Sequence, residues 1–192
     1  MPYIPIINNT PGIVGLLETY TDTGKVLRNL ADILLNKNSN AFNKAERETV
    51  ASYISFLNNC NFCYKSHSAI ADCLWKKKGK TKEIINKIEK QNVSSNNDNN
   101  GNNDNNDNND KIETLLYIAK KLHASPQGIK QEDINLLKVF DFTPDDINDL
   151  ILIISSFCMF NRYVDGLGTF YSLDDEMYNT MGEKIACNGY II

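Results

Sequence analysis

Apolar side chains recur every three or four residues along most of this chain, which is the spacing of one face of an α-helix. Val50, Ile54 and Leu57 are an example, and Ala51 widens the same stripe. The pattern predicts helices over residues 26–35, 44–57, 60–78, 112–122, 131–139 and 145–164. No segment alternates convincingly between apolar and polar residues, as a half-buried strand would. We therefore expect an all-α helical bundle that forms a single domain over residues 1–192.

Residues that favour helix ends stand at several of the expected boundaries. Thr143 is followed by Pro144 and two aspartates, a combination that suits the start of a helix. The third helix is expected to carry the lysines at 76–78 in its last turn, where positive charge is favourable, and to stop at Gly79. His123 is expected to act as a capping charge in the last turn of its own helix.

Residues 91–110 differ from the rest of the chain, because eleven of the twenty are Asn and four are Asp. Such a segment has no apolar surface to offset the entropy lost on ordering. We interpret it as a disordered, low-complexity insertion within the domain. A Ca²⁺ loop is the alternative, but no glutamate closes a twelve-residue loop of the EF-hand kind.

The composition narrows the classes of function. With 192 residues, 42% apolar residues and a net charge of −4, the chain is typical of a globular protein without the basic excess of a nucleic-acid binder. We find neither a secretory leader nor a membrane span, and expect a cytoplasmic protein with no nucleic-acid or membrane partner. In that compartment the five cysteines should be reduced, and a CxxC pair should be redox-active or metal-binding.

Cys60 and Cys63 form the CxxC pair, and His67 follows four residues later. If a helix starts at Cys60, the three side chains share one stripe, and Cys63 lies in the first turn. The free N–H groups and the helix dipole should lower the pKa of the Cys63 thiol there. Glu48, on the preceding antiparallel helix, could orient and charge His67, and through it deprotonate a cysteine.

These residues resemble a known signature. Glu46-Arg47-Glu48 followed by CNFCYKSH at residues 60–67 is similar to the alkylhydroperoxidase D (AhpD-like) and carboxymuconolactone decarboxylase superfamily, which has a glutamate and then CxxCxxxH. The C-terminal half resembles the peroxidase-related branch, through LLYIAKKL at 115–122, ASPQGIKQEDI at 124–134 and FNRYVDGLG at 160–168. The likeness spans roughly residues 27–168 and is interrupted by the Asn-rich insertion.

The resemblance implies a helical fold that assembles into homo-oligomers, and a peroxiredoxin-type, thiol-dependent reduction of hydroperoxides. It implies that Cys63 is the peroxidatic thiol and Cys60 the resolving thiol, with His67 and Glu48 as proton relay. The implied partners are a hydroperoxide substrate and a dithiol electron donor of unknown identity, with no metal or other cofactor.

The chain departs from the alkylhydroperoxidase proper at one position. That enzyme has a second histidine between its cysteines, where this chain has Phe62. The peroxidase-related branch commonly has an aromatic residue there. By the same resemblance, the decarboxylase members lack the dithiol arrangement, which counts against a lactone decarboxylase.

Other readings of these residues stay open. Cys60, Cys63, His67 and Cys73 could supply four zinc ligands, although three of them would crowd one helix and Cys73 falls on another part of it. A thioredoxin-like enzyme would need a βαβ context that is missing. A non-catalytic helical assembly module is the third alternative. We expect Cys73, Cys158 and Cys187 to be idle or buried thiols, because none has a partner at suggestive spacing. We expect Arg162 to lie either at a subunit interface or near the site.

Overall fold

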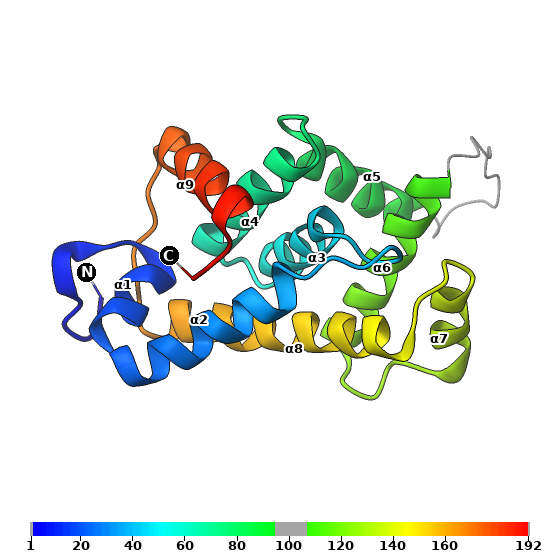
Figure 1. The fold of residues 1–192 in the computed structure, drawn as a ribbon, viewed down its shortest axis with the longest axis horizontal. Coiled ribbons are helices and arrows are strands. Elements are labelled where there is room, and N and C mark those ends of the chain that lie inside the picture. Colours follow the sequence, from blue (N-terminus) through cyan, green and yellow to red (C-terminus); the bar gives the residue numbers. More distant parts are fainter. Residues whose placement is uncertain (1, 95–106, 192) are drawn as a thin grey trace.

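The structure is a computed structural model that describes residues 2–94 and 107–191. Within these ranges it is helical and contains no strand, which confirms the predicted all-α class. The elements, labelled in Figure 1, are η1 (Ile7–Asn9), α1 (Gly12–Thr19), α2 (Thr21–Leu35), α3 (Lys44–Leu57), α4 (Asn61–Leu74), α5 (Lys80–Ser94), α6 (Asp107–Ala124), α7 (Gln131–Lys138), α8 (Pro144–Gly166) and α9 (Asp175–Asn188).

Helix α3 lies at the centre of the molecule. All of its residues from Ala45 to Ser55 are buried, and it packs against α4, α6 and α8. A capping box fixes its start: the N–H of Glu46 donates to Asn43 Oδ1 at 3.1 Å, and the N–H of Asn43 donates to Glu46 Oε2 at 2.9 Å. The site residues on α3 are therefore held by a helix that neighbours surround.

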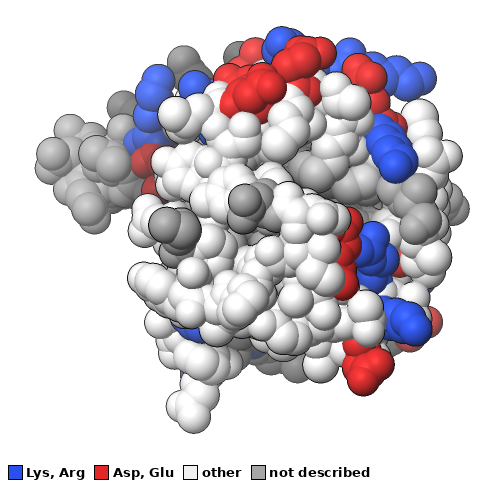
Figure 2. Space-filling view, turned by 90° about the vertical axis from the view of Figure 1, so that its left-hand side faces the viewer, with Lys and Arg blue, Asp and Glu red and all other residues white. Residues whose placement is uncertain are grey.

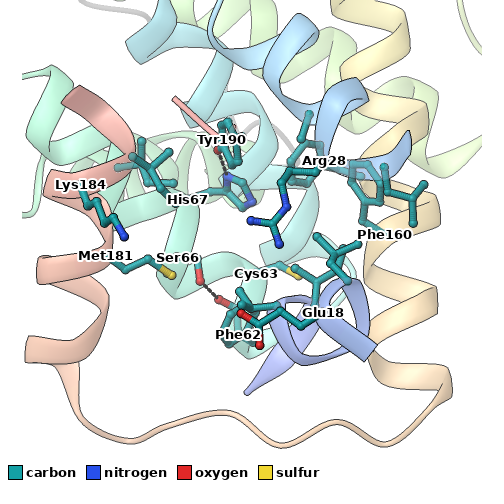
Figure 3. Close-up of a pocket in the computed structure, with 18 residues that line it drawn as sticks. Glu18, Arg28, Phe62, Cys63, Ser66, His67, Phe160, Met181, Lys184 and Tyr190 are labelled. Carbon is teal, nitrogen blue, oxygen red and sulfur yellow. Dashed lines mark hydrogen bonds between the residues drawn. The ribbon is translucent and has the colours of Figure 1, made fainter. Parts of the chain in front are cut away.

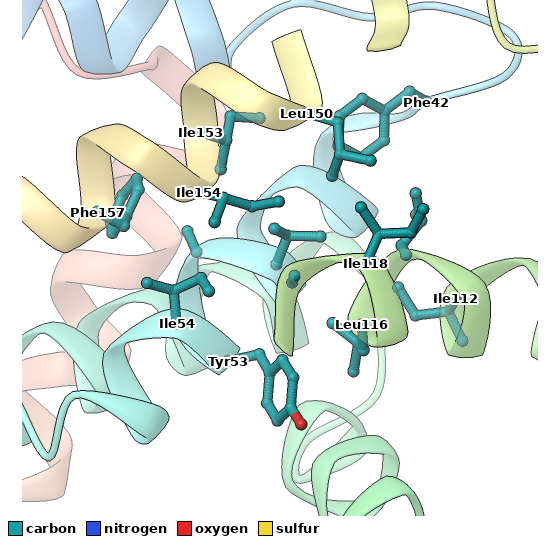
Figure 4. Close-up of a cluster of buried hydrophobic side chains, with 14 of the residues drawn as sticks. Phe42, Tyr53, Ile54, Ile112, Leu116, Ile118, Leu150, Ile153, Ile154 and Phe157 are labelled. Atoms are coloured by element: carbon teal, nitrogen blue, oxygen red, sulfur yellow. The ribbon is translucent and has the colours of Figure 1, made fainter. Parts of the chain in front are cut away.

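The hydrophobic core lies between α3, α6 and α8 (Figure 4). Ile54, Leu116 and Ile153 are fully buried there, one from each of the three helices. Burying one such side chain contributes about 1.5–3 kcal/mol. A smaller cluster, formed by Cys60, Phe62, Cys63, Val164 and Tyr178, joins α4 to α8 and α9 at one end of the molecule.

A buried ion pair also holds α3 against α8. Arg47 is fully buried and its Nη1 donates to Asp149 at 3.0 Å and to the carbonyl of Leu34 at 2.9 Å. Its Nε donates to the carbonyl of Phe42 at 3.0 Å. Burial lowers the pKa of Arg47, and the bond to Asp149 opposes that shift. Because a buried charge without its partner is costly, this pair fixes how α3 and α8 meet.

The predicted helix over residues 60–78 ends four residues early, at Leu74. The lysines at 76–78 lie in the turn before α5, where Lys76 has a φ of 55°. Asp72 explains the break, because its carboxylate accepts bonds from the N–H groups of Gly79 and Thr81 and so caps the next helix. The expectation that these lysines occupy the last turn of a helix was wrong.

Three helices were not predicted. Helix α5 buries Ile84, Ile85 and Ile88 against the core, a spacing that the sequence does contain. Helix α1 is short, and α9 has few apolar residues; each lies beside α4. Both line the candidate site described below.

The prediction of a disordered insertion over residues 91–110 was wrong at both ends, where the structure is helical. Helices α5 and α6 extend into it, over residues 91–94 and 107–110. Residues 95–106, which make up the rest of the predicted insertion, lie outside the described residues. Salt bridges between Lys87 and Glu113 and between Lys120 and Glu89 join the two helices.

Helix α8 is the longest described helix, and its start is the one predicted. Thr143 accepts a bond from the N–H of Asp146, whose carboxylate bonds back to Thr143, and Pro144 occupies the first turn. By length and composition alone, α8 could cross a membrane, but half of its apolar window is buried inside the molecule. A core helix of a globular protein has the same properties.

Candidate active site

Cys60 and Cys63 lie at the start of α4, as predicted. Cys60 is the N-cap residue, and Cys63 is in the first turn. The turn before them is tight: Asn59 has a φ of 58°, and the N–H of Cys60 donates to the carbonyl of Ser55 at 3.0 Å. Both thiols are free and buried, with exposed fractions of 0% and 3%.

The pKa of the Cys63 thiol is affected by a hydrogen bond with the thiol of Cys60. That bond and the burial of the side chain raise the pKa of the Cys63 thiol well above its ordinary value. The predicted lowering of this pKa at the helix start is therefore wrong. A helix N-terminus acts through about half a unit charge, whereas a buried thiol loses its whole hydration and faces a second sulfur.

Two residues of α8 contact the thiols. Asn161 is hydrogen-bonded to Cys63 and lowers its pKa, and it also donates to Ser55 Oγ at 3.1 Å. Asp165 is hydrogen-bonded to Cys60. Desolvation raises the pKa of Asp165, and the bond from Cys60 acts in the opposite direction. The two residues are one helical turn apart, so one face of α8 serves both thiols.

Glu48 and His67 form the predicted pair. Glu48 Oε2 lies 2.7 Å from His67 Nδ1, with only 2% of the carboxylate side chain and 12% of the histidine side chain exposed. With Nδ1 protonated toward Glu48, a neutral imidazole keeps Nε2 free as an acceptor. Phe157 packs edge-on against the ring at 4.6 Å and restricts its orientation. The carboxylate thus holds the histidine in the tautomer that a general base needs.

Tyr190 completes this cluster and was not anticipated from the sequence. Its hydroxyl donates to Glu48 Oε1 at 2.5 Å and lies 3.3 Å from His67 Nδ1. Burial and the adjacent carboxylate raise the pKa of Tyr190 well above its ordinary value, which keeps the phenol a donor. Gly189, with φ 79° and ψ −166°, turns the chain after α9, and the N–H of Tyr190 donates to Asp32 at 2.8 Å.

An apolar cavity of about 450 Å³ opens beside the dithiol (Figure 3). Cys63 and His67 both line it, whereas Cys60 and Glu48 lie behind them. Its walls come from α1, α2, α4, α8 and α9, together with Tyr190. A volume of this size suits a small organic ligand. A molecule in the cavity would meet one thiol and one imidazole.

The predicted residues fall into two groups. Cys60, Cys63, His67 and Glu48 lie together. Cys73 lies elsewhere, with Asp72, Glu183 and Cys187 as its charged or thiol neighbours. In the described part of the chain, no three side chains of His, Cys, Asp or Glu are grouped as a metal site would require.

His123 lies in the last turn of α6, as predicted, and its side chain contacts Asn58. Its Nε2 lies 3.0 Å from Asn58 Oδ1, and Asn58 in turn donates to Asn161 Oδ1 at 2.9 Å. Burial and the nearby Arg162 lower the pKa of His123. Arg162 is exposed and donates to the carbonyl of Cys158, on its own helix, at 2.8 Å. A chain of side chains thus leads from His123 to Asn161, which contacts Cys63.

Solved structures with this arrangement of helices exist. The crystal structure of an uncharacterized peroxidase-related protein from Ralstonia eutropha JMP134, described as an alkylhydroperoxidase AhpD core, aligns with a TM-score of 0.68. The alignment covers 91% of this chain and 82% of that one, with 21% identity. An uncharacterized peroxidase-related protein from Silicibacter sp. TM1040 gives a TM-score of 0.66 and 20% identity, over 86% and 78% of the two chains.

The chain has the AhpD-like fold. This confirms the fold that the sequence resemblance implied. No protein-family model matches the chain, and a comparison with curated proteins finds no match. The AhpD-like assignment therefore describes the architecture, and the chemistry must be argued from the site itself.

Proposed function

We propose that this protein is a thiol peroxidase that reduces organic hydroperoxides. The observation that carries the proposal is the placement of a free CxxC dithiol beside a buried Glu48–His67–Tyr190 cluster, at the wall of an apolar cavity. The names of the two structural neighbours, both peroxidase-related proteins, support the same general class of activity.

The first step in the proposed reaction takes place at Cys63. The raised pKa of this thiol means that a base must remove its proton, and His67 lines the same cavity with Nε2 available. The thiolate attacks the terminal oxygen of ROOH and breaks the O–O bond, which gives a sulfenic acid and an alkoxide. The protonated imidazole returns its proton to the alkoxide, so the products are Cys63–SOH and ROH. Glu48 stabilises the intervening positive charge.

The second step closes the disulfide. The Cys60 sulfur attacks the Cys63 sulfenic acid, its proton leaves with the hydroxyl as water, and a Cys60–Cys63 bond forms. Asp165, which accepts a hydrogen bond from Cys60, is placed to take that proton. An external dithiol then reduces the disulfide by thiol–disulfide exchange. A homo-oligomeric assembly and a cytoplasmic location are further parts of the proposal.

A thiol titration tests the mechanism. The reduced protein has five free cysteines, and after one equivalent of cumene hydroperoxide we expect three titratable thiols per chain. Cys63→Ser should retain all four of its thiols, and Cys60→Ser should yield a sulfenic acid that dimedone traps. Cys73→Ser is the matched control, because Cys73 lies outside the cluster, and it should lose two thiols as the native chain does. Unchanged thiols in the native protein would refute the mechanism.

A further inference from the structure

The cavity beside the dithiol has more apolar wall surface than the proposed reaction at Cys63 and His67 requires. Its walls are mainly aliphatic and aromatic, including Leu17, Leu27, Ile70, Phe160 and Ile185. A small hydroperoxide would need only the part next to Cys63 and His67. The remaining apolar surface is suited to a hydrocarbon chain, because removing each CH₂ group from water is favourable.

Arg28 is the unusual residue of this cavity. It projects from α2 into the apolar space (Figure 3), and its side chain is partly buried. Within residues 2–94 and 107–191, its guanidinium has no ion pair or hydrogen bond. Arg47, the other arginine near α2, has its charge neutralised by Asp149. An arginine that faces an apolar cavity with its donors free is suited to a carboxylate brought by a ligand, which it can bind through two parallel hydrogen bonds.

The charged side chains in the cavity lining are two positive and one negative, a balance that favours an anionic ligand. Lys184, on α9, adds a second positive charge from the opposite wall. Glu18 is the one carboxylate in the lining, and it accepts a bond from the hydroxyl of Thr10 at 3.3 Å. The end of the molecule that carries α1 and the start of α2 is mostly uncharged, with acidic and basic groups gathered along its edges (Figure 2). An apolar molecule with one negative group fits these surroundings.

We propose that the cavity binds a fatty acid, with its carboxylate on Arg28 and its hydrocarbon chain along the apolar walls. This deepens the proposed function, on which it rests for the reacting group: the substrate would be a fatty-acid hydroperoxide whose peroxide group reaches Cys63. Arg28 would be the residue that selects carboxylated over neutral hydroperoxides. The binding itself requires no reaction at the thiols.

Isothermal titration calorimetry of the reduced protein with octanoate and with 1-octanol tests the binding without any peroxide. We expect the native protein to bind octanoate more tightly than 1-octanol. Arg28→Gln should weaken octanoate binding about tenfold, as expected for the loss of a hydrogen-bonded charge, and should leave 1-octanol binding unchanged. The octanoate affinity of Arg28→Lys should fall between those of the native protein and Arg28→Gln, because lysine keeps the positive charge and loses the paired donors.

Lys25→Gln is the matched control. Lys25 lies one helical turn before Arg28, is exposed and does not line the cavity, so the same change in net charge should leave octanoate binding as it is. Circular dichroism melting of each variant identifies any loss of folding. Equal affinity of the native protein for octanoate and 1-octanol, or an unchanged octanoate affinity in folded Arg28→Gln, would overturn the inference.

The two proposals fail separately. Octanoate binding that depends on Arg28, without any loss of thiols in the peroxide titration, would support the fatty-acid site and refute the peroxidase mechanism. If peroxide oxidises the thiols but octanoate affinity is the same with and without Arg28, the peroxidase proposal stands and the fatty-acid site is refuted.

Discussion

Glu46, Arg47 and Glu48 are consecutive charged residues, and all three are buried in α3. Each has its own counter-charge or partner: Glu46 forms a salt bridge with Lys111, Arg47 with Asp149, and Glu48 contacts the imidazole of the site. Successive residues on a helix point about 100° apart, so three neighbouring side chains reach three different helices. These three charged residues, which the sequence alone could place on a solvent-exposed face, therefore join α3 to α6, α8 and α4.

Tyr190 offers a prediction at the residue scale. Tyr190→Phe removes the hydroxyl that donates to Glu48 and keeps the ring. Because a hydrogen bond to a charged group is worth about 1.5–3 kcal/mol, we expect the rate of thiol oxidation by cumene hydroperoxide to fall about tenfold or more. Stopped-flow measurement of the rate checks this.

Tyr163→Phe is the control for that variant, since no hydrogen bond of its hydroxyl is found among the described residues. Its rate should match that of the native protein. Equal rates for both variants would show that Tyr190 does not position the Glu48–His67 pair.

Cys60 allows a second residue-scale prediction, on the pH dependence of thiol reactivity. Its hydrogen bond is the largest cause of the raised pKa of Cys63. Cys60→Ala removes that bond, so the pKa of Cys63 should fall and the fraction of thiolate at neutral pH should rise. We expect iodoacetamide to alkylate Cys63 faster at pH 7 in Cys60→Ala than in the native chain, with the half-maximal rate at lower pH.

That profile should remain above the ordinary thiol range, because burial still raises the pKa of Cys63 in the variant. Mass spectrometry of the Cys63 peptide follows the modification at one residue. An unchanged pH profile would mean that desolvation alone sets this pKa.

At the scale of elements, the packing of α9 on α4 brings Tyr190 to the site. Gly182 makes the contact possible: a Cβ at this position would lie 2.9 Å from the backbone carbon of Ala69. The helix ends at Asn188, and the positive φ of Gly189 directs Tyr190 back toward α2 and α3. The site therefore depends on two glycines that have no catalytic chemistry of their own.

Gly182→Val tests this dependence. The added side chain cannot fit against Ala69 without moving α9, so we expect a loss of about 1–3 kcal/mol in the free energy of unfolding, as for other overpacked contacts. Thiol oxidation should slow as well, because Tyr190 moves with the helix. Urea unfolding and stopped-flow rates measure the two effects.

Gly166→Val is the matched control, since nothing lies within 4 Å of a Cβ built at Gly166. It should cost little stability and leave the rate unchanged. If Gly182→Val oxidises its thiols as fast as the native protein, the position of α9 does not affect catalysis.

At the scale of the whole molecule, several buried tyrosine and cysteine side chains share one property: each stays protonated and neutral in the folded state. Burial raises the pKa of Tyr178 to about 12, and it raises those of Tyr53 and Tyr190 as well. The hydrogen bond with Cys60, together with burial, raises the pKa of Cys63. Tyr53 also donates to Glu89 at 2.6 Å, which disfavours its anion further. Folding therefore requires these protons to stay bound.

This predicts that the protein loses stability in alkaline solution. Where folded pKa values are raised, stability is complete below the unfolded values, about 8.5 for Cys and about 10 for Tyr, and falls as the pH rises beyond them. Urea unfolding at pH 8 and pH 10.5 should show a lower unfolding free energy at the higher pH. Tyr53→Phe should reduce the difference, and equal free energies at the two pH values would contradict the assignment.

Residue spacing was enough to predict the helical class and to place Cys63 and His67 one turn apart on one helix, because both depend on positions along a single segment. Only the tertiary structure brought Tyr190 to Glu48, 142 residues away, and turned Arg28 into the cavity. It also reversed the predicted direction of the Cys63 pKa, since burial and the neighbouring thiol outweigh the local helix dipole. Spacing fixes which side chains share a helix face, whereas desolvation and contacts between distant helices arise only once the chain has packed.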